Sequence, residues 1–518
     1  MTFTLPHMIT ESADKYPDKD AFRCGTNKIS YSELADKSGQ LAYALRDAGL
    51  QREDRVGVYL ERSLETAIAI YGVMCAGGVY VPLDPLAPSD RTIAQVTDCQ
   101  IQIIISSPAQ KTGLKTLIEK VKLTLLIGLS VDWPVPSLTW KDLETLPKNP
   151  KINILEHDLA YIMYTSGSTG SPKGIMHTHH SGLAYVKLST KLYELSNQDV
   201  VATHAPLHFD ISTFGYLSSP YTGATSVVIP EAYTKMPASL AQLISREKIS
   251  IWYSVPLALI QLLQHGVLPD WDFSSLRWVL FGGEVFPAHY LRSLMREWNT
   301  AQFSNVYGPA EVNQCTYFHL NELPVGDSDV PIGRVWDNTE VLIIDSQDSQ
   351  VPSGTSGELL VRSATMMQGY WNQPELTEKS FYRHSSTSGI EKVYYRTGDQ
   401  VRRSDSGDLI FLGRIDRQVK VRGYRIELDE ISRLLKNNQK IEGAAVYLTA
   451  DDQGEKIIAA TIITKDNILL DESEILQYLA KYLPRYAIPT LILFKRSIPR
   501  NSNGKIDYQK LQQLNIND

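Results

Sequence analysis

The sequence has few cysteines and no pattern that pairs them. Only four occur in 518 residues and none lies in a C-x-x-C pair, so a disulfide framework and a structural zinc site are both disfavoured. This cysteine usage is typical of a reducing, cytoplasmic compartment. Basic residues are not in excess either. The chain has 51 Lys and Arg against 58 Asp and Glu, a net charge of −7, which argues against a nucleic-acid partner.

Targeting signals and long apolar runs are equally scarce. The N-terminus has no basic region and soon reaches Glu11 and Asp14, unlike a signal peptide. The one long uncharged run, residues 66–83, contains three glycines and Pro82. A buried helix that leads into a strand explains this run better than a membrane span does. We therefore expect no membrane partner.

The composition is that of an ordinary globular protein, with 43% apolar and 21% charged residues and enough length for two to four domains. Strand and helix patterns alternate along it. Residues 30–33 form a capping box that begins a helix, and Gly49 ends it. Strands are predicted over 55–60 and 79–81, with a buried helix over 63–76 between them. Apolar strands between helices predict a layered α/β fold with mostly parallel sheets.

A change of composition near Gly413 indicates a second, smaller domain. Residues 414–425 contain five basic residues and one acid, Asp416; taken alone, they are also typical of a solvated surface. The residues beyond predict helices over 427–435 and 472–482, and strands over 443–448 and 456–463. We interpret the chain as an N-terminal core over 1–415, a hinge at Asp416, and a small mobile α+β lid over 416–518.

The most informative segment is 164–174, with the sequence YTSGSTGSPKG. It follows an apolar strand over 159–164 and precedes a strand over 175–178. Small residues let backbone N–H groups approach phosphate oxygens, and Lys173 adds positive charge. A P-loop is excluded because Pro172 precedes the lysine and a glycine follows it. The predicted phosphate-binding residues are Thr165, Ser166, Gly167, Ser168, Thr169, Gly170 and Lys173.

With this loop, seven further motifs in a fixed order give the chain a family resemblance. They lie at 76–85, 209–212, 305–311, 357–359, 395–399, 413–423 and 501–507. Together they resemble the adenylate-forming superfamily and, within it, the amino-acid adenylation domains of nonribosomal peptide synthetases. The resemblance implies that a carboxylate attacks the α-phosphate of ATP, which releases pyrophosphate and leaves an acyl-adenylate. Since two anions must meet, Mg²⁺ and cationic side chains are expected.

The resemblance also implies residue roles. Glu311 would hold Mg²⁺ and Asp399 would bind both ribose hydroxyls, tasks that suit carboxylates. Lys505 would be the catalytic group that bridges the substrate carboxylate and the ribose-phosphate oxygen. The other nucleotide-binding residues would be Gly283 and Glu284 along the adenine, Asn305 at its amino edge, Tyr307 stacked on it, and Arg414 at the ribose. Ala310 stands where the family usually has Thr, whose hydroxyl would donate to the α-phosphate; this departure concerns one phosphate contact worth ~1 kcal/mol and does not remove the reaction.

Asp210 indicates which acid is activated, because the amino-acid branch of the family pairs this carboxylate with the substrate's α-ammonium. The other predicted pocket positions are Ile211, Phe214, Tyr253, Leu280, Gly282, Val306, Gln314 and Cys315. Apart from Asp210 and Lys505 this lining carries no side-chain charge, so a small or medium apolar amino acid is expected. The set resembles that of free-standing prolyl-adenylating enzymes, and the chain resembles the prolyl ligases of cyanobacterial anatoxin biosynthesis. Proline is therefore the expected substrate.

The chain ends 13 residues after Lys505, so the expected acceptor is the phosphopantetheine thiol of a separate carrier protein. An acidic carrier would meet the basic residues Arg417, Lys420, Arg422 and Arg425. Three alternatives stay open. A D-alanyl or other small amino-acid carrier-protein ligase is the first. An acyl-CoA ligase is disfavoured by Asp210, and an inactive nucleotide-binding scaffold by the presence of Lys505, Glu311 and Asp399.

Overall fold

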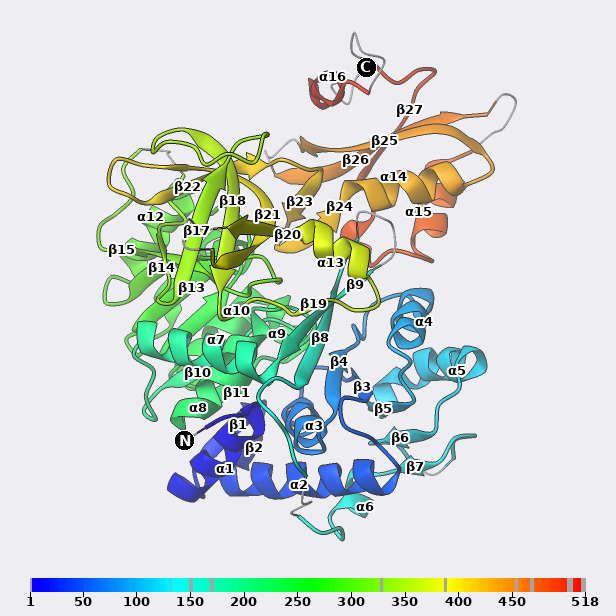
Figure 1. Cartoon of the computed structure of the whole chain (residues 1–518), viewed down its shortest axis with the longest axis vertical. Helices are drawn as coiled ribbons and strands as arrows, with labels where there is room; N and C mark the ends of the chain where they lie inside the picture. The colour runs from blue at the N-terminus through cyan, green and yellow to red at the C-terminus, as the bar shows by residue number, and fades with distance from the viewer. Residues whose placement is uncertain are drawn as a thin grey trace. The chain divides into compact units, whose positions relative to one another are not determined.

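The structure is a computed structural model of the chain (Figure 1). It describes residues 2–130, 132–148, 152–167, 172–326, 329–385, 389–451, 455–465, 470–500 and 506–513. The chain divides into two compact units. The first contains Met1–Pro85, Val96–Tyr164 and Gly174–Ile415, and the second contains Leu86–Gln95, Thr165–Lys173 and Asp416–Asp518. The second unit thus includes two short segments that the sequence analysis assigned to the core.

The largest sheet of the first unit has nine strands in the order β16-β15-β14-β13-β12-β10-β11-β1-β2. Its strands are β1 (Asp20–Cys24), β2 (Asn27–Ser30), β10 (Val200–Thr203), β11 (Thr225–Val228), β12 (Ile251–Ser254), β13 (Trp278–Gly282), β14 (Gln302–Tyr307), β15 (Thr316–Leu320) and β16 (Arg334–Val335). The run from β14 to β1 is parallel, and the pairs at the two edges are antiparallel. This confirms the predicted, mostly parallel architecture.

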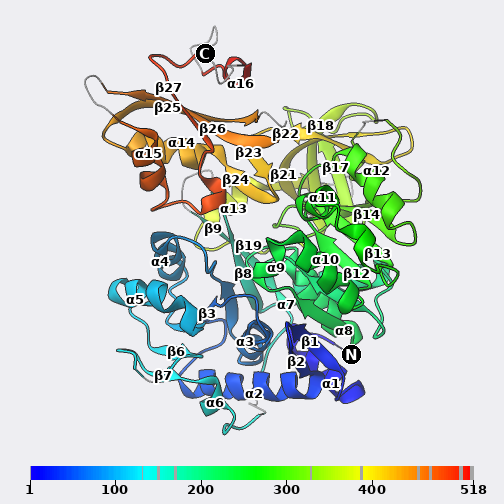
Figure 2. The ribbon, with the colours of Figure 1, turned by 180° about the vertical axis from the view of Figure 1, so that it is seen from behind.

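The two faces of this sheet pack against different partners. Helices α10 (Pro237–Arg246), α11 (Pro256–Gln264) and α12 (Ala288–Glu297) cover one face (Figure 2). Trp252 packs on that side, whereas its neighbours Ile251 and Tyr253 belong to a separate apolar cluster. Successive strand residues point to opposite faces. The second cluster, which also contains Leu280 and Val306, is therefore built on the other face.

The second sheet of the unit has eight strands in the order β19-β9-β8-β4-β3-β5-β6-β7. They are β3 (Arg55–Tyr59), β4 (Val79–Pro82), β5 (Ile103–Ser106), β6 (Leu125–Ile127), β7 (Ser137–Leu138), β8 (Leu159–Thr165), β9 (Lys173–Thr178) and β19 (Gly369–Tyr370). Helices α2 (Tyr31–Asp47) and α3 (Leu64–Cys75) belong with it in one apolar cluster. The capping box at Ser30 and Glu33 is present, and Gly49 follows the helix with φ +92°. Among the described residues, no helix has the length and apolar character that crossing a membrane requires.

A third sheet of the first unit was not predicted. Strands β17 (Thr339–Ile344), β18 (Ser356–Ser363), β21 (Glu391–Arg403) and β20 (Phe381–Ser385) form it in that order, and β22 (Leu409–Arg414) pairs with β21. All its pairings are antiparallel. The remaining helices of this unit are α1 (Leu5–Lys15), η1 (Pro108–Gln110), α5 (Lys111–Lys120), α6 (Trp140–Leu143), α7 (His179–Leu192), η2 (Phe214–Ser218), α8 (Ser219–Thr222), α9 (Glu231–Thr234), η3 (Leu268–Asp270) and α13 (Pro374–Ser380).

The second unit has its own core around α14 (Leu428–Asn437) and the sheet β25-β26-β27. Its elements are β23 (Gln418–Val421), β24 (Tyr424–Glu427), β25 (Ile441–Ala450), β26 (Lys456–Thr464), α15 (Glu472–Leu479), η4 (Arg485–Ala487), β27 (Leu491–Phe494), α16 (Tyr508–Gln513) and most of α4 (Ser89–Asp98). The predicted helix over 472–482 ends earlier, at Leu479. Pro484 disfavours helical backbone at the residue before it, so the chain turns away first.

Candidate active site

The predicted site residues of the first unit gather where parallel strands of the nine-stranded sheet end. Tyr253 lies in β12, Gly282 ends β13, and Tyr307 ends β14. Asp210 follows β10, the neighbour of β12. In open parallel sheets, ligands bind beyond the carboxyl ends of the strands. This edge is therefore the candidate active site.

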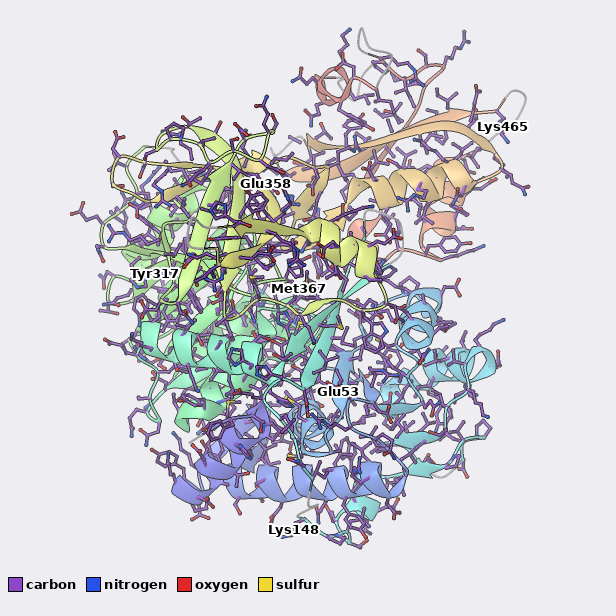
Figure 3. All side chains as sticks on the ribbon, viewed as in Figure 1. Glu53, Lys148, Tyr317, Glu358, Met367 and Lys465 are labelled. Atoms are coloured by element: carbon purple, nitrogen blue, oxygen red, sulfur yellow. The ribbon has the colours of Figure 1, made fainter. Side chains whose placement is uncertain are left out.

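Asp399 is held by two partners of its own unit. Its Oδ1 accepts a hydrogen bond at 2.8 Å from Nη1 of Arg414, which lies opposite it on β22, and its Oδ2 accepts one from the Tyr307 hydroxyl. Glu358, labelled in Figure 3, accepts the Gly398 N–H at 3.2 Å and fixes the preceding residue. Burial and the nearby Asp399 charge raise the pKa of Tyr307, so its hydroxyl stays a proton donor. The carboxylate is thus fixed in place before any ligand binds.

Asn305, Gly283 and Glu284 lie near the same strand ends. The Asn305 amide donates to the Pro331 carbonyl at 2.9 Å, which fixes the orientation of its side chain. Gly283 follows β13 with φ +92°, a backbone conformation that glycine adopts without strain. Glu284, the next residue, is half-buried.

Glu311 is 0% exposed and is surrounded by aromatic groups that the sequence did not identify. Its Oε1 accepts a hydrogen bond at 2.7 Å from Tyr370, whose hydroxyl lies 3.4 Å from that of Tyr395. The Glu311 carbonyl accepts the N–H of Met367, labelled in Figure 3, at 2.7 Å. Buried His177 contacts the Ala310 carbonyl at 3.0 Å through Nε2. The turn that carries Glu311 is therefore held from several elements.

The donor chemistry at Glu311 fits Mg²⁺. Within the described residues no group of three or more His, Cys, Asp or Glu side chains could hold a metal. Mg²⁺ is commonly bound through one or two carboxylates, with waters and substrate phosphates as the remaining ligands. For this type of Mg²⁺ binding, the protein needs to supply only one carboxylate, such as Glu311.

Asp210 lies in the second part of the site, among tyrosines. Its Oδ1 accepts the Ile211 N–H at 2.9 Å. Burial raises the pKa values of Tyr161, Tyr185 and Tyr253, and the Asp210 charge raises each of them further. The Asp210 charge therefore acts on the hydroxyls of tyrosines from β8, α7 and β12. Neither Tyr161 nor Tyr185 was predicted, because nothing local distinguishes them from core tyrosines.

The remaining pocket positions form tight, largely apolar walls. The rings of Phe214 and Tyr253 meet edge to face at 5.8 Å, and Gln314 Nε2 donates to the Tyr253 hydroxyl at 2.6 Å. A Cβ at Gly282 would lie 2.3 Å from the Val306 carbonyl oxygen, so only glycine fits there. The other predicted wall residues are half-buried Ile211, fully buried Leu280 and Cys315, and Val306 at 2% exposed. Cys315 and the other three cysteines are free thiols, as predicted.

The predicted phosphate loop and lid belong to the second unit. The loop segment in this unit begins at Thr165 and ends at Lys173. Within it, the Ser166 hydroxyl donates to the Arg425 carbonyl at 3.0 Å. Gly167 is described, whereas Ser168, Thr169, Gly170 and the predicted catalytic Lys505 lie outside the described residues.

At the predicted hinge, Asp416 accepts the Gln418 N–H at 3.1 Å. Arg417, one of four basic residues predicted to meet a carrier, is already engaged within the unit. It pairs with Asp429 at 2.8 Å, and its guanidinium lies 3.6 Å from the centre of the Tyr508 ring. The Arg417 guanidinium therefore already has partners within its own unit.

Comparison with known proteins gives consistent matches. The family model described as AMP-binding enzyme matches residues 9–371. An L-proline--[L-prolyl-carrier protein] ligase of Pseudomonas fluorescens is 31% identical over 507 residues, 97% of each chain. Bacitracin synthase 1 of Bacillus licheniformis is 32% identical over 98% of this chain, which spans only 9% of that protein. The adenylation domain AlmE of Vibrio cholerae, solved with glycyl-adenosine-5'-phosphate, has a TM-score of 0.84 and 27% identity, with 99% and 98% of the chains covered.

Proposed function

Since the chain belongs to the family of AMP-binding enzymes, we propose that it activates L-proline with ATP and passes it to a carrier-protein thiol. In the first step a carboxylate oxygen of the amino acid bonds to the α-phosphorus of ATP. The bond from that phosphorus to the β-phosphate bridge breaks, and pyrophosphate leaves. In the second step a phosphopantetheine thiol loses its proton and attacks the acyl carbon, and AMP leaves.

The observation that carries this proposal is the position of Asp210. Its charge acts on buried tyrosines, and a negative charge in such surroundings is costly unless a cation or hydrogen bonds compensate it. An amino acid brings an ammonium group to this place. A fatty or aryl acid brings no positive charge, which disfavours the acyl-CoA ligase alternative.

The second carboxylate site suits the nucleotide. Asp399 is fixed by Arg414 and Tyr307, and a fixed carboxylate presents two acceptors to the hydroxyls of a ribose. Glu311 would hold Mg²⁺, which supplies positive charge to the phosphates during the transfer. Lys505 and the phosphate loop keep the roles that the family resemblance implies, as does rotation of the lid about Asp416.

Proline is favoured over other amino acids by two facts. A relative that the chain matches over 97% of both lengths is named an L-proline carrier-protein ligase. The pocket also has aromatic walls at Phe214 and Tyr253 and no second charged side chain among the described pocket residues. A smaller substrate is the second candidate, because the similar AlmE structure holds glycyl-adenosine-5'-phosphate. The link to anatoxin biosynthesis stays a prediction.

Amino-acid-dependent exchange of labelled pyrophosphate into ATP tests the proposal. The panel contains the twenty amino acids, D-alanine, a fatty acid and an aryl acid, the last two also with coenzyme A. Proline should give the highest exchange. If D-alanine or glycine gives the highest exchange, that amino acid is the substrate instead of proline. If acyl-CoA forms, the enzyme is an acyl-CoA ligase instead of a carrier-protein ligase. Mass spectrometry of a phosphopantetheinylated carrier protein tests the second step.

A further inference from the structure

Four buried polar atoms of the candidate site have no hydrogen-bond partner within the described part of the chain. They are the hydroxyls of Tyr161 and Tyr185 and the side-chain carbonyl oxygens of Asn313 and Gln314. All four side chains are at most 4% exposed. Buried polar groups without partners are rare and costly, so a cluster of them indicates a place for a polar ligand.

Contacts through Thr213 connect Asn313 to Asp210. The Thr213 hydroxyl donates to the Asp210 carbonyl at 2.6 Å, which uses its one hydrogen. Its oxygen then accepts from Asn313 Nδ2 at 3.3 Å. The hydrogen-bond network therefore assigns the amide orientation, and Asn313 Oδ1 faces away from Thr213.

The hydroxyl of Tyr161 interacts with both residues. Burial raises the pKa of its hydroxyl, the Asp210 charge raises it further, and Asn313 lowers it. Neither the Tyr161 hydroxyl nor Asn313 Oδ1 has a hydrogen-bond partner of normal geometry in the described residues. Asn313 Oδ1 is thus an unused acceptor on a side chain that is joined to Asp210 through Thr213.

The backbone holds Asn313 in this place. Its φ is +57°, in the left-handed region that asparagine tolerates better than most residues. The turn is also tight, since a Cβ at Gly308 would lie 2.0 Å from the Asn313 carbonyl oxygen. Asn313 is therefore a preorganised group rather than a loose surface amide.

We infer that Asn313 Oδ1 is a second hydrogen-bond acceptor for the α-ammonium of the substrate, beside Asp210, an inference that rests on the proposed amino-acid activation. The ammonium of proline has two N–H groups. Asp210 accepts one and balances the charge, and Asn313 accepts the other. Asn313 is then a specificity residue that detects how many N–H groups the substrate nitrogen carries.

The variant Asn313→Gly tests this role, because glycine keeps the positive φ and removes the acceptor. Asn338→Gly is the matched control, since Asn338 also has φ +57° but is exposed. In pyrophosphate exchange we expect the KM for proline to rise about 10-fold or more in Asn313→Gly, since hydrogen bonds to charged groups are the stronger ones. The KM for ATP should be unchanged, and the control should match the wild type.

A substrate with one N–H fewer separates this role from a structural one. The amino acid with the highest wild-type exchange, expected to be L-proline, is compared with its N-methyl derivative. Asn313→Gly should raise the KM of the parent amino acid more than that of the derivative. A general distortion of the pocket would instead raise both KM values equally, and that result would overturn the inference.

The remaining outcomes are distinguishable. An active wild type together with an unchanged KM in Asn313→Gly overturns the inference and leaves the proposed function intact. A wild type that exchanges with no amino acid overturns the proposed function, and the inference with it. If Asn313→Gly does not fold, Thr213→Val replaces it. This variant removes the hydroxyl that orients the Asn313 amide and should give the same substrate dependence with a smaller rise.

Discussion

Asp210 and Asp399 are both candidate ligand-binding carboxylates of the first unit, but their surroundings differ. Asp399 is 4% exposed and accepts hydrogen bonds from Arg414 and Tyr307. Asp210 is half-buried and lies among polar atoms that have no partner in the described residues. The protein thus completes the surroundings of one carboxylate itself. At the other it leaves groups that a ligand would complete.

Removal of the negative charge at each site should give the largest difference between the two carboxylates. Asp210→Asn should lower amino-acid-dependent exchange by about 100-fold or more, because loss of one partner of a buried ion pair costs roughly 3–5 kcal/mol. Its ATP affinity, measured by calorimetry, should stay at the wild-type value. Asp399→Asn should show the reverse pattern, weaker ATP binding with an unchanged ranking of amino acids. Loss of both affinities in both variants would contradict two separate subsites.

The free energy of unfolding should depend more on the surroundings of Asp399 than on those of Asp210. Arg414→Met leaves Asp399 as a buried carboxylate without its cation, so the free energy of unfolding should fall by about 3–5 kcal/mol. Asp210→Asn should change the free energy of unfolding less, since Asp210 is half-buried and its charge keeps part of its hydration. Urea unfolding of the ligand-free proteins measures both changes. An equal loss in both variants would mean that Asp210 is as fully compensated as Asp399.

Loss of the Tyr370 hydroxyl should weaken Mg²⁺ binding at Glu311, with a smaller effect than the changes at Asp210 and Asp399. Tyr370→Phe removes the hydrogen bond to the Glu311 carboxylate, and such bonds to charged groups are worth about 1.5–3 kcal/mol. We expect exchange to need about ten times more Mg²⁺ for half-maximal rate. Tyr382→Phe is the control, because the Tyr382 hydroxyl donates to a surface carbonyl at 3.2 Å. An identical Mg²⁺ dependence in both variants would remove Tyr370 from the site.

Buried His179 should give a pH dependence of stability away from both carboxylates. Burial lowers its pKa from 6.5 to about 4, while Asp158 raises it and His7 lowers it. The unfolded chain therefore binds a proton that the folded chain does not bind between pH 6.5 and 4. Stability falls as the pH drops through this window, by about 1.4 kcal/mol per pH unit.

His179→Asn keeps an acceptor for the Leu5 N–H and does not titrate in this window. Urea unfolding at several pH values should show a flatter dependence for this variant. The dependence should not vanish, because burial also lowers the pKa values of His177 and His204. An unchanged slope would show that His179 is protonated in the fold.

The parts of the fold with local signals could be predicted from the sequence. Helix α2 has a capping box and α3 a continuous apolar run, and both occur close to the expected bounds. The antiparallel sheet of β17, β18, β20, β21 and β22 was missed, although β20, β21 and β22 pair as local hairpins. Helix α15 was predicted too long because residues 480–483 form turns that continue the helix only irregularly.

The residues of the candidate site also fall into those that the sequence identified and those that it missed. Asp210, Asp399 and Glu311 stand in recognisable motifs, so sequence alone singled them out. Tyr370 was missed because its contact with Glu311 joins residues 59 positions apart. Asn313 was missed because its meaning comes from a positive φ and from the hydrogen bond to Thr213.

The alternation of side chains along β12, β13 and β14 has a consequence for how such a protein changes over evolutionary time. Tyr253, Leu280 and Val306 belong to the apolar cluster on one face of the sheet, whereas Trp252 and Val279 pack toward helices α10, α11 and α12 on the other. If the first three residues line the substrate pocket as proposed, a mutation at one of them alters the pocket and leaves the packing of those helices intact. New substrate preferences are therefore accessible by single substitutions, and no intermediate variant has to lose its fold.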